Sequence, residues 1–167
     1  MTLKLKAQPI SAERFAPFGD VIHAGTENAS AMNDARFLRF NDLARIEVDP
    51  QAGGRPCVSI ARCRTPTSLP YCIEMMERHP KGSQAFVPLA PFSFLVVVAP
   101  PAESVDTAQL HAFVTSGREG VNYRKGVWHM PMIGLSSGQQ FLIIDRAGDD
   151  SNCEEIVLGE SVIVDIE

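Results

Sequence analysis

Four side chains of this chain have the types and spacing of a ligand-binding cluster, and they come from two distant segments: Glu77, His79, Gln84 and His129. A carboxylate, imidazoles and an amide oxygen are suitable ligands for a divalent metal ion or for a small polar molecule. A lone histidine beside Trp128 is more often a core residue. Its combination with a carboxylate and an imidazole two residues apart predicts a metal or small-ligand site.

The residues around the first segment predict how it positions its side chains. Glu77 and His79 are two residues apart, and on a strand this spacing points both side chains to the same face. The run Pro80-Lys81-Gly82 is typical of a turn. Gln84 would then stand early on the returning strand, within cross-strand reach of His79. We therefore expect a hairpin inside a small β-barrel to carry three of the four residues.

The rest of the chain is predicted to be mainly β. Short runs of β-forming residues separated by turn residues predict a sandwich or a barrel, and these runs span 57–61, 71–77, 84–88, 92–98, 121–123, 127–129, 141–145, 155–158 and 162–164. The apolar run 92–98 is typical of a strand buried on both faces. Ser11 is a predicted N-cap of one short helix, and 107–111 is a predicted helical turn. Residues 25–33 are predicted to form a loop.

Composition indicates one ordinary globular domain spanning 1–167, with 45% hydrophobic and 21% charged residues. The net charge of −5 argues against nucleic acid and against anionic membranes as partners. The apolar run 92–99 is too short to cross a bilayer. The first residues lack the apolar stretch of a secretion signal, and the four cysteines form no Cys-x-x-Cys pair. We therefore expect a cytoplasmic protein with reduced thiols.

Several blocks in order along the chain resemble the ureidoglycolate lyase family of cupin-like proteins: 18–22, 77–89, 120–123, 127–129, 141–146 and 152–153. The pattern Glu-x-His, four residues, Gln, followed later by Trp-His, is similar to a degenerate form of the two cupin motifs. The resemblance implies a cupin-like β-barrel of the double-stranded β-helix type with one or two short helices, usually a homodimer. It also implies a carbon–nitrogen lyase that cleaves (S)-ureidoglycolate into glyoxylate and urea in allantoin (purine) degradation.

The resemblance implies a metal site at the four matched positions, Glu77, His79, Gln84 and His129, with nickel as the metal. The residue types do not exclude manganese or zinc. Ureidoglycolate is a carbinolamine, so its cleavage removes a hydroxyl proton and protonates the departing urea nitrogen. A metal bound to the hydroxyl and the carboxylate would acidify the hydroxyl. In an alternative without metal, Glu77 or His129 is the general base.

Further residues are candidates for substrate binding and proton transfer. The substrate carboxylate needs a cation, for which Arg62 matches an arginine of the family and Arg39 is a second candidate. Gln84 can bind the substrate through its amide. Tyr123 and Lys125 are two residues apart and should share a strand face, so either can donate the proton to urea.

The chain departs from the family pattern at three positions where the family carries histidine: Arg124, Met130 and Asn41. These departures motivate an alternative function, a non-catalytic ligand-binding or sensory cupin for a small ureide or hydroxy acid. A metallo-cupin of another kind, such as an isomerase or an oxygenase, is a third hypothesis. Iron-dependent oxygen activation generally uses more imidazoles than this chain supplies.

The expectation of a homodimer also draws on two local features. Arg78 stands between Glu77 and His79, so strand alternation points it to the opposite face, toward the surface or a dimer interface. The apolar run 162–164 is expected at an open sheet edge, and an open edge favours pairing with a second subunit.

Overall fold

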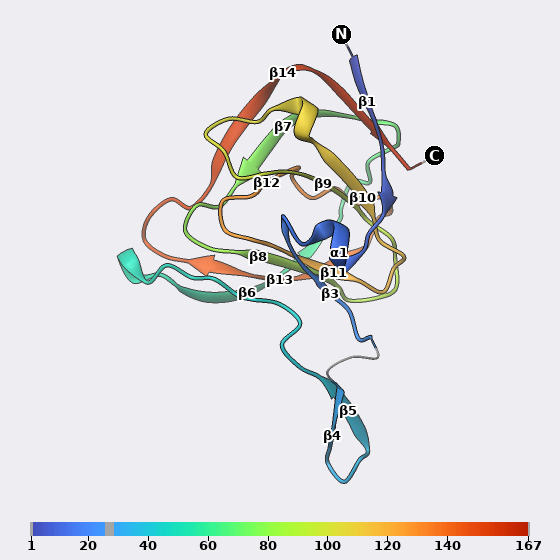
Figure 1. Ribbon diagram of the computed structural model, residues 1–167, viewed down its shortest axis with the longest axis vertical. Coiled ribbons are helices and arrows are strands. Elements are labelled where there is room, and N and C mark those ends of the chain that lie inside the picture. The colour runs from blue at the N-terminus through green and yellow to red at the C-terminus, as the bar shows by residue number, and fades with distance from the viewer. Residues whose placement is uncertain (1, 26–28, 167) are drawn as a thin grey trace.

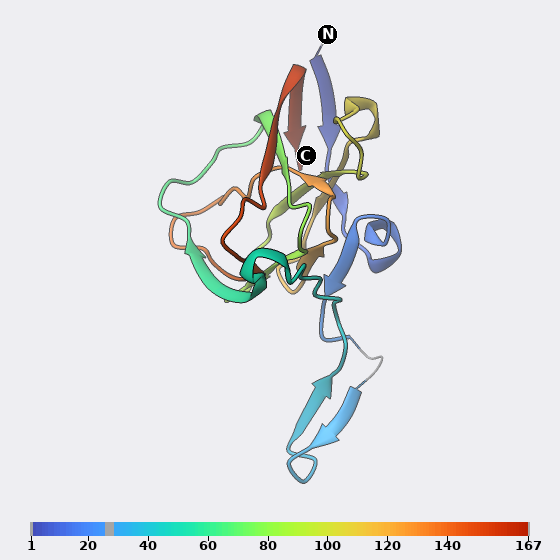
Figure 2. The same ribbon diagram turned by 90° about the vertical axis from the view of Figure 1, so that its left-hand side faces the viewer.

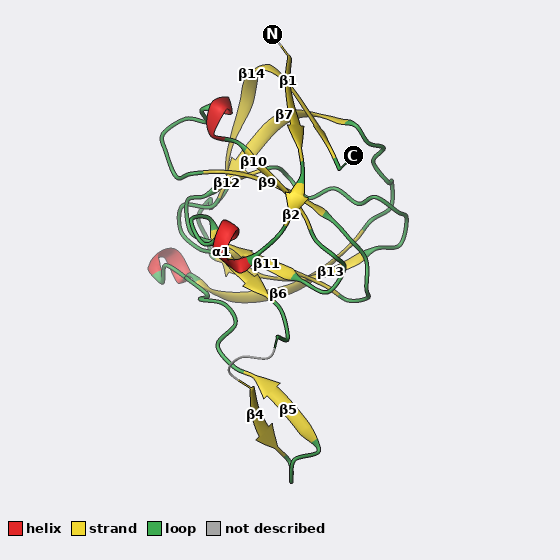
Figure 3. Ribbon diagram, turned by 45° about the vertical axis from the view of Figure 1, so that its right-hand side comes forward, coloured by secondary structure: helices red, strands yellow, loops and turns green. Residues whose placement is uncertain are grey.

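The computed structural model describes residues 2–25 and 29–166, which form mainly strands in two large sheets (Figures 1 and 3). The first sheet has seven strands in the order β1 (Thr2–Lys6), β14 (Glu154–Asp165), β7 (Tyr71–Arg78), β12 (Trp128–His129), β9 (Leu95–Ala99), β10 (His111–Val114) and β2 (Gln8–Pro9). The second has five strands in the order β3 (Gly19–Ile22), β11 (Gly120–Tyr123), β8 (Gln84–Pro88), β13 (Gln140–Ala147) and β6 (Arg55–Arg62).

The remaining elements are short. They are the hairpin β4 (Ala29–Met32) and β5 (Phe37–Phe40), the helix α1 (Ala12–Phe15), and the 3₁₀ turns η1 (Gln51–Gly53) and η2 (Thr107–Gln109). Ser11 caps α1 as predicted, and its side chain accepts a hydrogen bond from the Arg14 backbone N–H at 3.3 Å. Within the described part of the chain, no helix has the length and apolar character needed to cross a bilayer.

The N-terminal segment nearly closes the seven-stranded sheet. β1 pairs in parallel with β14 at one edge of the sheet, and β2 pairs in parallel with β10 at the opposite edge. A single residue, Ala7, connects β1 to β2. Closure of a sheet on itself removes its open edges. The result is the cupin-like, mainly β barrel that the sequence predicts, with few and short helices.

Two buried clusters lie on opposite faces of the seven-stranded sheet. On β9, Leu95, Val97 and Ala99 belong to one cluster, and the intervening Val96 and Val98 belong to the other. The second cluster also contains residues of the five-stranded sheet, such as Phe141, so it fills the space between the two sheets. The prediction of a strand buried on both faces is confirmed for Leu95–Ala99, whereas the predicted residues 92–94 precede the strand.

The predicted hairpin between β7 and β8 is wrong. β7 pairs with β14 and β12, whereas β8 pairs with β11 and β13, so the turn at Pro80-Lys81-Gly82 carries the chain from one sheet to the other. Sequence proximity favours pairing of consecutive strands, but here both strands have partners that are distant in the sequence. The turn nevertheless keeps the end of β7 close to the start of β8.

The C-terminal strand is also placed differently from the prediction. The two expected strands are one strand, β14, with an irregularity between Val157 and Val162. β14 lies between β7 and β1, and Val162 is fully buried. The idea of an open sheet edge at 162–164 is therefore wrong, because β1, which the sequence did not reveal, covers that edge.

The predicted loop at 25–33 is wrong for Ala29–Met32, which forms β4; residues 26–28 lie outside the described part of the chain. β4 and β5 pair with each other in a sheet of their own. This hairpin projects from the body of the molecule in both of the perpendicular views (Figures 1 and 2).

Candidate metal centre

The four predicted ligand residues converge between the two sheets. His129 on β12 is the direct antiparallel partner of Glu77 on β7, and its Nε2 lies 3.3 Å from Glu77 Oε1. His79, just after β7, places its Nε2 4.0 Å from the same oxygen. Gln84 on β8 places its Oε1 3.1 Å from His79 Nε2. The structure therefore gathers side chains of both sheets, although β7 and β8 are not paired.

Backbone carbonyls fix the orientation of both imidazoles. His79 Nδ1 lies 2.7 Å from the carbonyl oxygen of Asn152, and His129 Nδ1 lies 3.2 Å from that of Val127. A carbonyl oxygen only accepts hydrogen bonds, so each Nδ1 donates to its carbonyl and each Nε2 faces the cluster. Metal-bound histidines are commonly oriented in this way through the ring nitrogen that does not bind the metal.

Burial sets the charge states of the central pair. Desolvation lowers the pKa of His129, whose side chain is 1% exposed, so this ring is neutral at neutral pH. The pKa of Glu77 is lowered chiefly by the adjacent His129 side chain, against the opposing effect of burial. A neutral imidazole beside an ionised carboxylate is the form in which both groups bind a metal ion.

Most of the side-chain atoms that face the interior of the cluster are hydrogen-bond acceptors, and such a set of atoms is suited to binding a cation. His129 Nε2 is buried and has no hydrogen-bond partner. The ligand atoms of Glu77, His79 and His129 all lie within 4.8 Å of one another. Lone pairs that face each other repel in a site of low polarity, and a cation bound among them removes the repulsion. The three residues therefore fit a divalent metal ion.

Tyr123 forms one wall of the cluster. Its ring stacks on His129 with a centroid separation of 4.2 Å and an interplanar angle of 11°. The residue is buried on β11, and burial, followed by the charge of Glu77, raises the pKa of its hydroxyl well above the ordinary value. The stacked ring restricts how the imidazole can turn. The structure thus places Tyr123 beside the centre, in a position suited to holding His129 in place. The prediction that Tyr123 and Lys125 share a strand face is wrong, because β11 ends at the buried Tyr123 and Lys125 is exposed in the turn that follows.

Three supporting residues were not assigned roles from the sequence. Asp145 Oδ2 accepts a hydrogen bond from Gln84 Nε2 at 3.3 Å, which turns the amide oxygen of Gln84 toward His79. Asn152 holds His79 through its backbone oxygen, and Cys153 Sγ lies 3.9 Å from Glu77 Oε2. These three residues lie in the blocks 141–146 and 152–153, which belong to the family resemblance, and only this resemblance could have identified them from the sequence.

Other candidate residues lie outside the cluster. Arg62 stands opposite Gln140 on β13, and with the Gln140 amide oriented to accept, its oxygen lies 3.1 Å from Arg62 Nε. Arg39 is part of the projecting hairpin. Lys125 is exposed in the turn after β11, and the next residue's backbone N–H donates to the His79 carbonyl at 3.0 Å. That turn therefore lies against the centre, whereas both arginines are elsewhere.

Arg78 faces away from the centre, as strand alternation predicted. Its guanidinium forms an ion pair with Glu154 at 2.5 Å and lies over the Trp128 ring, 4.6 Å from its centroid.

The three positions that depart from the family pattern contribute no side chain to the cluster. Met130 is buried in the hydrophobic cluster on the opposite face of the seven-stranded sheet. Arg124 is exposed and donates to the carbonyl oxygen of Ala16 at 3.2 Å. Asn41 follows β5 and donates to Ser30 Oγ at 2.9 Å. None of the three replaces a residue that faces Glu77.

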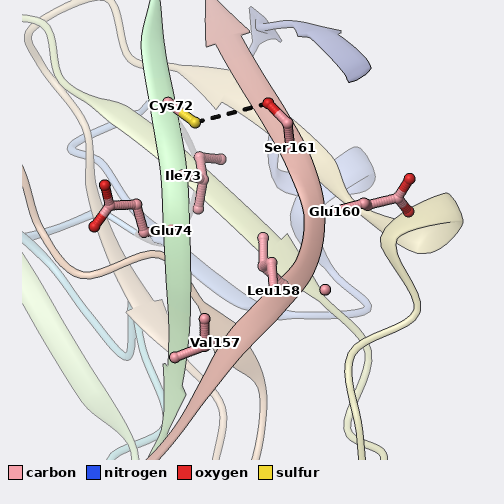
Figure 4. Close-up of a pocket in the computed structure, with 8 residues that line it drawn as sticks. Cys72, Ile73, Glu74, Val157, Leu158, Glu160 and Ser161 are labelled. Atoms are coloured by element: carbon pink, nitrogen blue, oxygen red, sulfur yellow. Dashed lines mark hydrogen bonds between the residues drawn. The ribbon is translucent and has the colours of Figure 1, made fainter. Parts of the chain in front are cut away.

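A separate hollow of about 390 Å³ lies along β7 and β14 (Figure 4). Its walls include Cys72 and Ser161, whose side-chain sulfur and oxygen are 3.9 Å apart, and Val157. It forms where the pairing of β14 with β7 is interrupted between Val157 and Val162. The four residues of the cluster do not line it.

Comparison with known proteins relates the whole chain to a single family. A family model described as ureidoglycolate lyase matches residues 2–165. The ureidoglycolate lyase of Burkholderia mallei (strain NCTC 10229) is 48% identical over 158 residues, covering 95% of this chain and 91% of that protein. The ureidoglycolate lyases of Azotobacter vinelandii and Pseudomonas savastanoi pv. phaseolicola are 42% and 40% identical, covering 93% and 96% of this chain and 93% and 94% of those proteins.

Proposed function

The chain belongs to the ureidoglycolate lyase family, and from this premise we propose that it cleaves (S)-ureidoglycolate into glyoxylate and urea. The observation that carries the proposal is the cluster of Glu77, His79 and His129, in which both Nε2 atoms and one carboxylate oxygen face the same space. A hydroxy acid is a chelating ligand, and this cluster fits the cation that such a ligand needs.

We propose that the cluster holds one divalent metal ion, with nickel favoured by the family resemblance. When bound, such an ion would acidify the substrate hydroxyl and attract its carboxylate. Glu77, His79 and His129 would hold it, and Gln84 is a weaker fourth ligand or a hydrogen-bond partner of the substrate. Arg62 and Arg39 lie outside the cluster, so we propose that neither is the main partner of the substrate carboxylate.

The reaction moves one proton off the hydroxyl and one onto the urea nitrogen, which takes the electron pair of the broken C–N bond. In the alternative without metal, we propose that Glu77, kept ionised by its lowered pKa, accepts the hydroxyl proton. We assign proton donation to Lys125 in preference to Tyr123, because the raised pKa of the buried Tyr123 makes its hydroxyl a poor acid. Tyr123 would instead hold the His129 ring.

The alternative function, a non-catalytic ligand-binding or sensory cupin, has less support once the positions of the replaced histidines are known. That alternative was motivated by the histidines replaced at Arg124, Met130 and Asn41. Met130 lies in a hydrophobic core, and the other two have contacts away from the cluster. At the level of the whole molecule, we propose that 1–167 is one domain that acts in the cytoplasm, in allantoin degradation, as a homodimer.

The test combines metal analysis with a product assay. Protein loaded with Ni²⁺, Mn²⁺ or Zn²⁺ is analysed for bound metal and then given racemic ureidoglycolate, and glyoxylate and urea are measured. Glu77→Gln should lose metal and turnover. The matched control is Glu74→Gln, because Glu74 is an exposed glutamate on the same strand, β7, and is not among the clustered ligand residues. No glyoxylate above the spontaneous rate with any of these metals would contradict the proposal.

A further inference from the structure

Among the described residues, the β4–β5 hairpin, hereafter the arm (29–40), is joined to the body of the molecule at its base. Just after it, the Arg45 backbone N–H donates to Asp20 Oδ2 at 3.0 Å, and Asn122 Nδ2 donates to the same oxygen at 3.0 Å. Among the described strands, β4 and β5 pair only with each other. A hairpin of two strands is marginally stable in water by itself. The arm therefore needs a surface on which to pack.

One face of the arm is entirely apolar. Ala29 stands opposite Phe40 and Ala31 opposite Leu38, and residues opposite each other on paired strands share a face. Leu38 is 65% exposed and both alanines are exposed. The other face is mixed, because it pairs Ser30 with Arg39 as well as Met32 with Phe37. An exposed apolar face of this kind marks an interaction surface.

The body of the molecule carries a second exposed apolar surface, here called the strip: Val58, Ile60, Leu142 and Ile144. Val58 pairs with Ile144 and Ile60 with Leu142, so the four side chains share the outer face of β6 and β13. Val58 is 66% and Ile60 62% exposed, whereas the neighbouring Phe141 points to the core and is 1% exposed. β6 is also an edge strand of its sheet, which adds unpaired backbone groups to the surface.

We propose that the arm of one copy of this chain packs its apolar face on the strip of a second copy. The inference rests on the proposed homodimer and names the surface that forms it. Each chain carries one arm and one strip, so a two-fold dimer covers both surfaces of both copies and closes. A different protein that bound the arm would leave the strip exposed.

The apolar area that this arrangement would cover comes from both surfaces. The large apolar residues on them that are more than half exposed are Leu38, on the apolar face of the arm, and Val58 and Ile60, on the strip. At roughly 100 Å² for each side chain, two copies would bury on the order of 600 Å² from these three residues. The half-buried Phe40, Leu142 and Ile144, the alanines and the main chain add to this area, and specific interfaces require roughly 1,000 Å² in total.

The test compares the masses of matched variants by sedimentation equilibrium at micromolar concentration. The natural protein should be a dimer of the 18.2 kDa chain. Leu38→Asp and Ile60→Asp should each weaken the dimer about 30-fold or more, as expected for central interface residues. The controls are Ser30→Asp, on the mixed face of the arm, and Val157→Asp, which is 77% exposed on β14; both should remain dimers.

Mixing the two disruptive variants gives a sharper result. A homodimer of either variant has two damaged contacts, whereas a mixed dimer keeps one intact arm on one intact strip. The mixture of Leu38→Asp and Ile60→Asp should therefore associate more tightly than either variant alone. If an aspartate variant fails to fold by circular dichroism, Leu38→Ser and Ile60→Ser replace the pair.

The outcomes separate the proposals. A natural protein that is monomeric overturns both the homodimer and the arm contact. A dimer that survives both substitutions, or a mixture that does not regain association, overturns the arm contact and leaves the homodimer. Glyoxylate release is measured on the same natural sample, and a dimer without release overturns the lyase activity but not the arm contact.

Discussion

The metal centre and the arm differ in how their side chains are supported. In the centre, each imidazole uses its Nδ1 to reach a backbone carbonyl and its Nε2 to face Glu77. The arm has regular strand pairing of its own, yet Leu38 and Phe37 remain more than half exposed. The centre is therefore preorganised by contacts within one chain, whereas the strands of the arm, among those the structure describes, pair only with each other.

This difference indicates where substitutions should affect activity. Residues of the centre act through fixed distances, so changes there should lower turnover or metal binding by large factors. Residues on the arm and at its foot should affect association and leave the chemistry of each centre unchanged. The predictions below test that separation, from the largest expected effect to the smallest.

His129→Ala should cause the largest loss. The side chain is buried against Glu77, and removal of a ligand or an acid–base group typically lowers the rate by about 10²–10⁴-fold. Arg124→Ala, on the exposed turn, is the control and should change kcat/KM by only about twofold, as expected for a surface residue. Steady-state kinetics with ureidoglycolate measures both, and equal losses would mean that the residues of this segment that face the substrate have been assigned wrongly.

Substitution of Tyr123 should separate positioning from acid catalysis. Tyr123→Leu removes the ring that stacks on His129 and should weaken metal binding by about 10–100-fold, the usual effect of losing a residue that orients a ligand. Tyr123→Phe keeps the ring and should retain metal affinity and turnover. A competitive chelator titration measures the affinity. If Tyr123→Phe binds metal normally but does not turn over, the hydroxyl is the proton donor and our assignment to Lys125 is wrong.

The loop behind His79 should make stability sensitive to strong acid. The side chains of Lys81 and Arg146 lower the pKa of Asp150 to about 2, from an ordinary value near 3.8. Between these values the unfolded chain binds more protons, so the contribution of Asp150 to stability is present above about pH 4 and is lost as the pH falls through about 2. Asp150→Asn should therefore show a smaller decrease in thermal stability over this range. An unchanged profile would contradict the ion pairs.

Substitution of Asn41, at the base of the arm, should have the smallest effect on activity. Asn41→His restores the residue that the family carries there, but the side chain of Asn41 donates to Ser30 Oγ on the arm. We expect kcat/KM for ureidoglycolate to change by no more than about twofold, in line with other surface substitutions. A large gain in activity would mean that the arm reaches a catalytic centre, in its own chain or in a partner.

Local rules predicted the parts of this protein that depend on near neighbours. The spacing of Glu77 and His79 placed both side chains on one face and Arg78 on the other, because alternation along a strand is a property of the backbone itself. For the same reason the sequence identified β8, the Ser11 cap and the apolar β9. The chemical types of the side chains, and then the family resemblance, connected His129 to the first segment.

Tertiary structure decided which strands lie together. The sequence placed 77–84 on a hairpin, but β7 and β8 lie in different sheets, and β1 covers the edge expected to be open at 162–164. The entropy of closing a loop grows only slowly with its length, so a distant partner with better packing can replace the nearest one. The carbonyls of Asn152 and Val127 that orient the two imidazoles carry no signal in residue type. Their positions exist only once β12, β7 and the segment before β14 have come together.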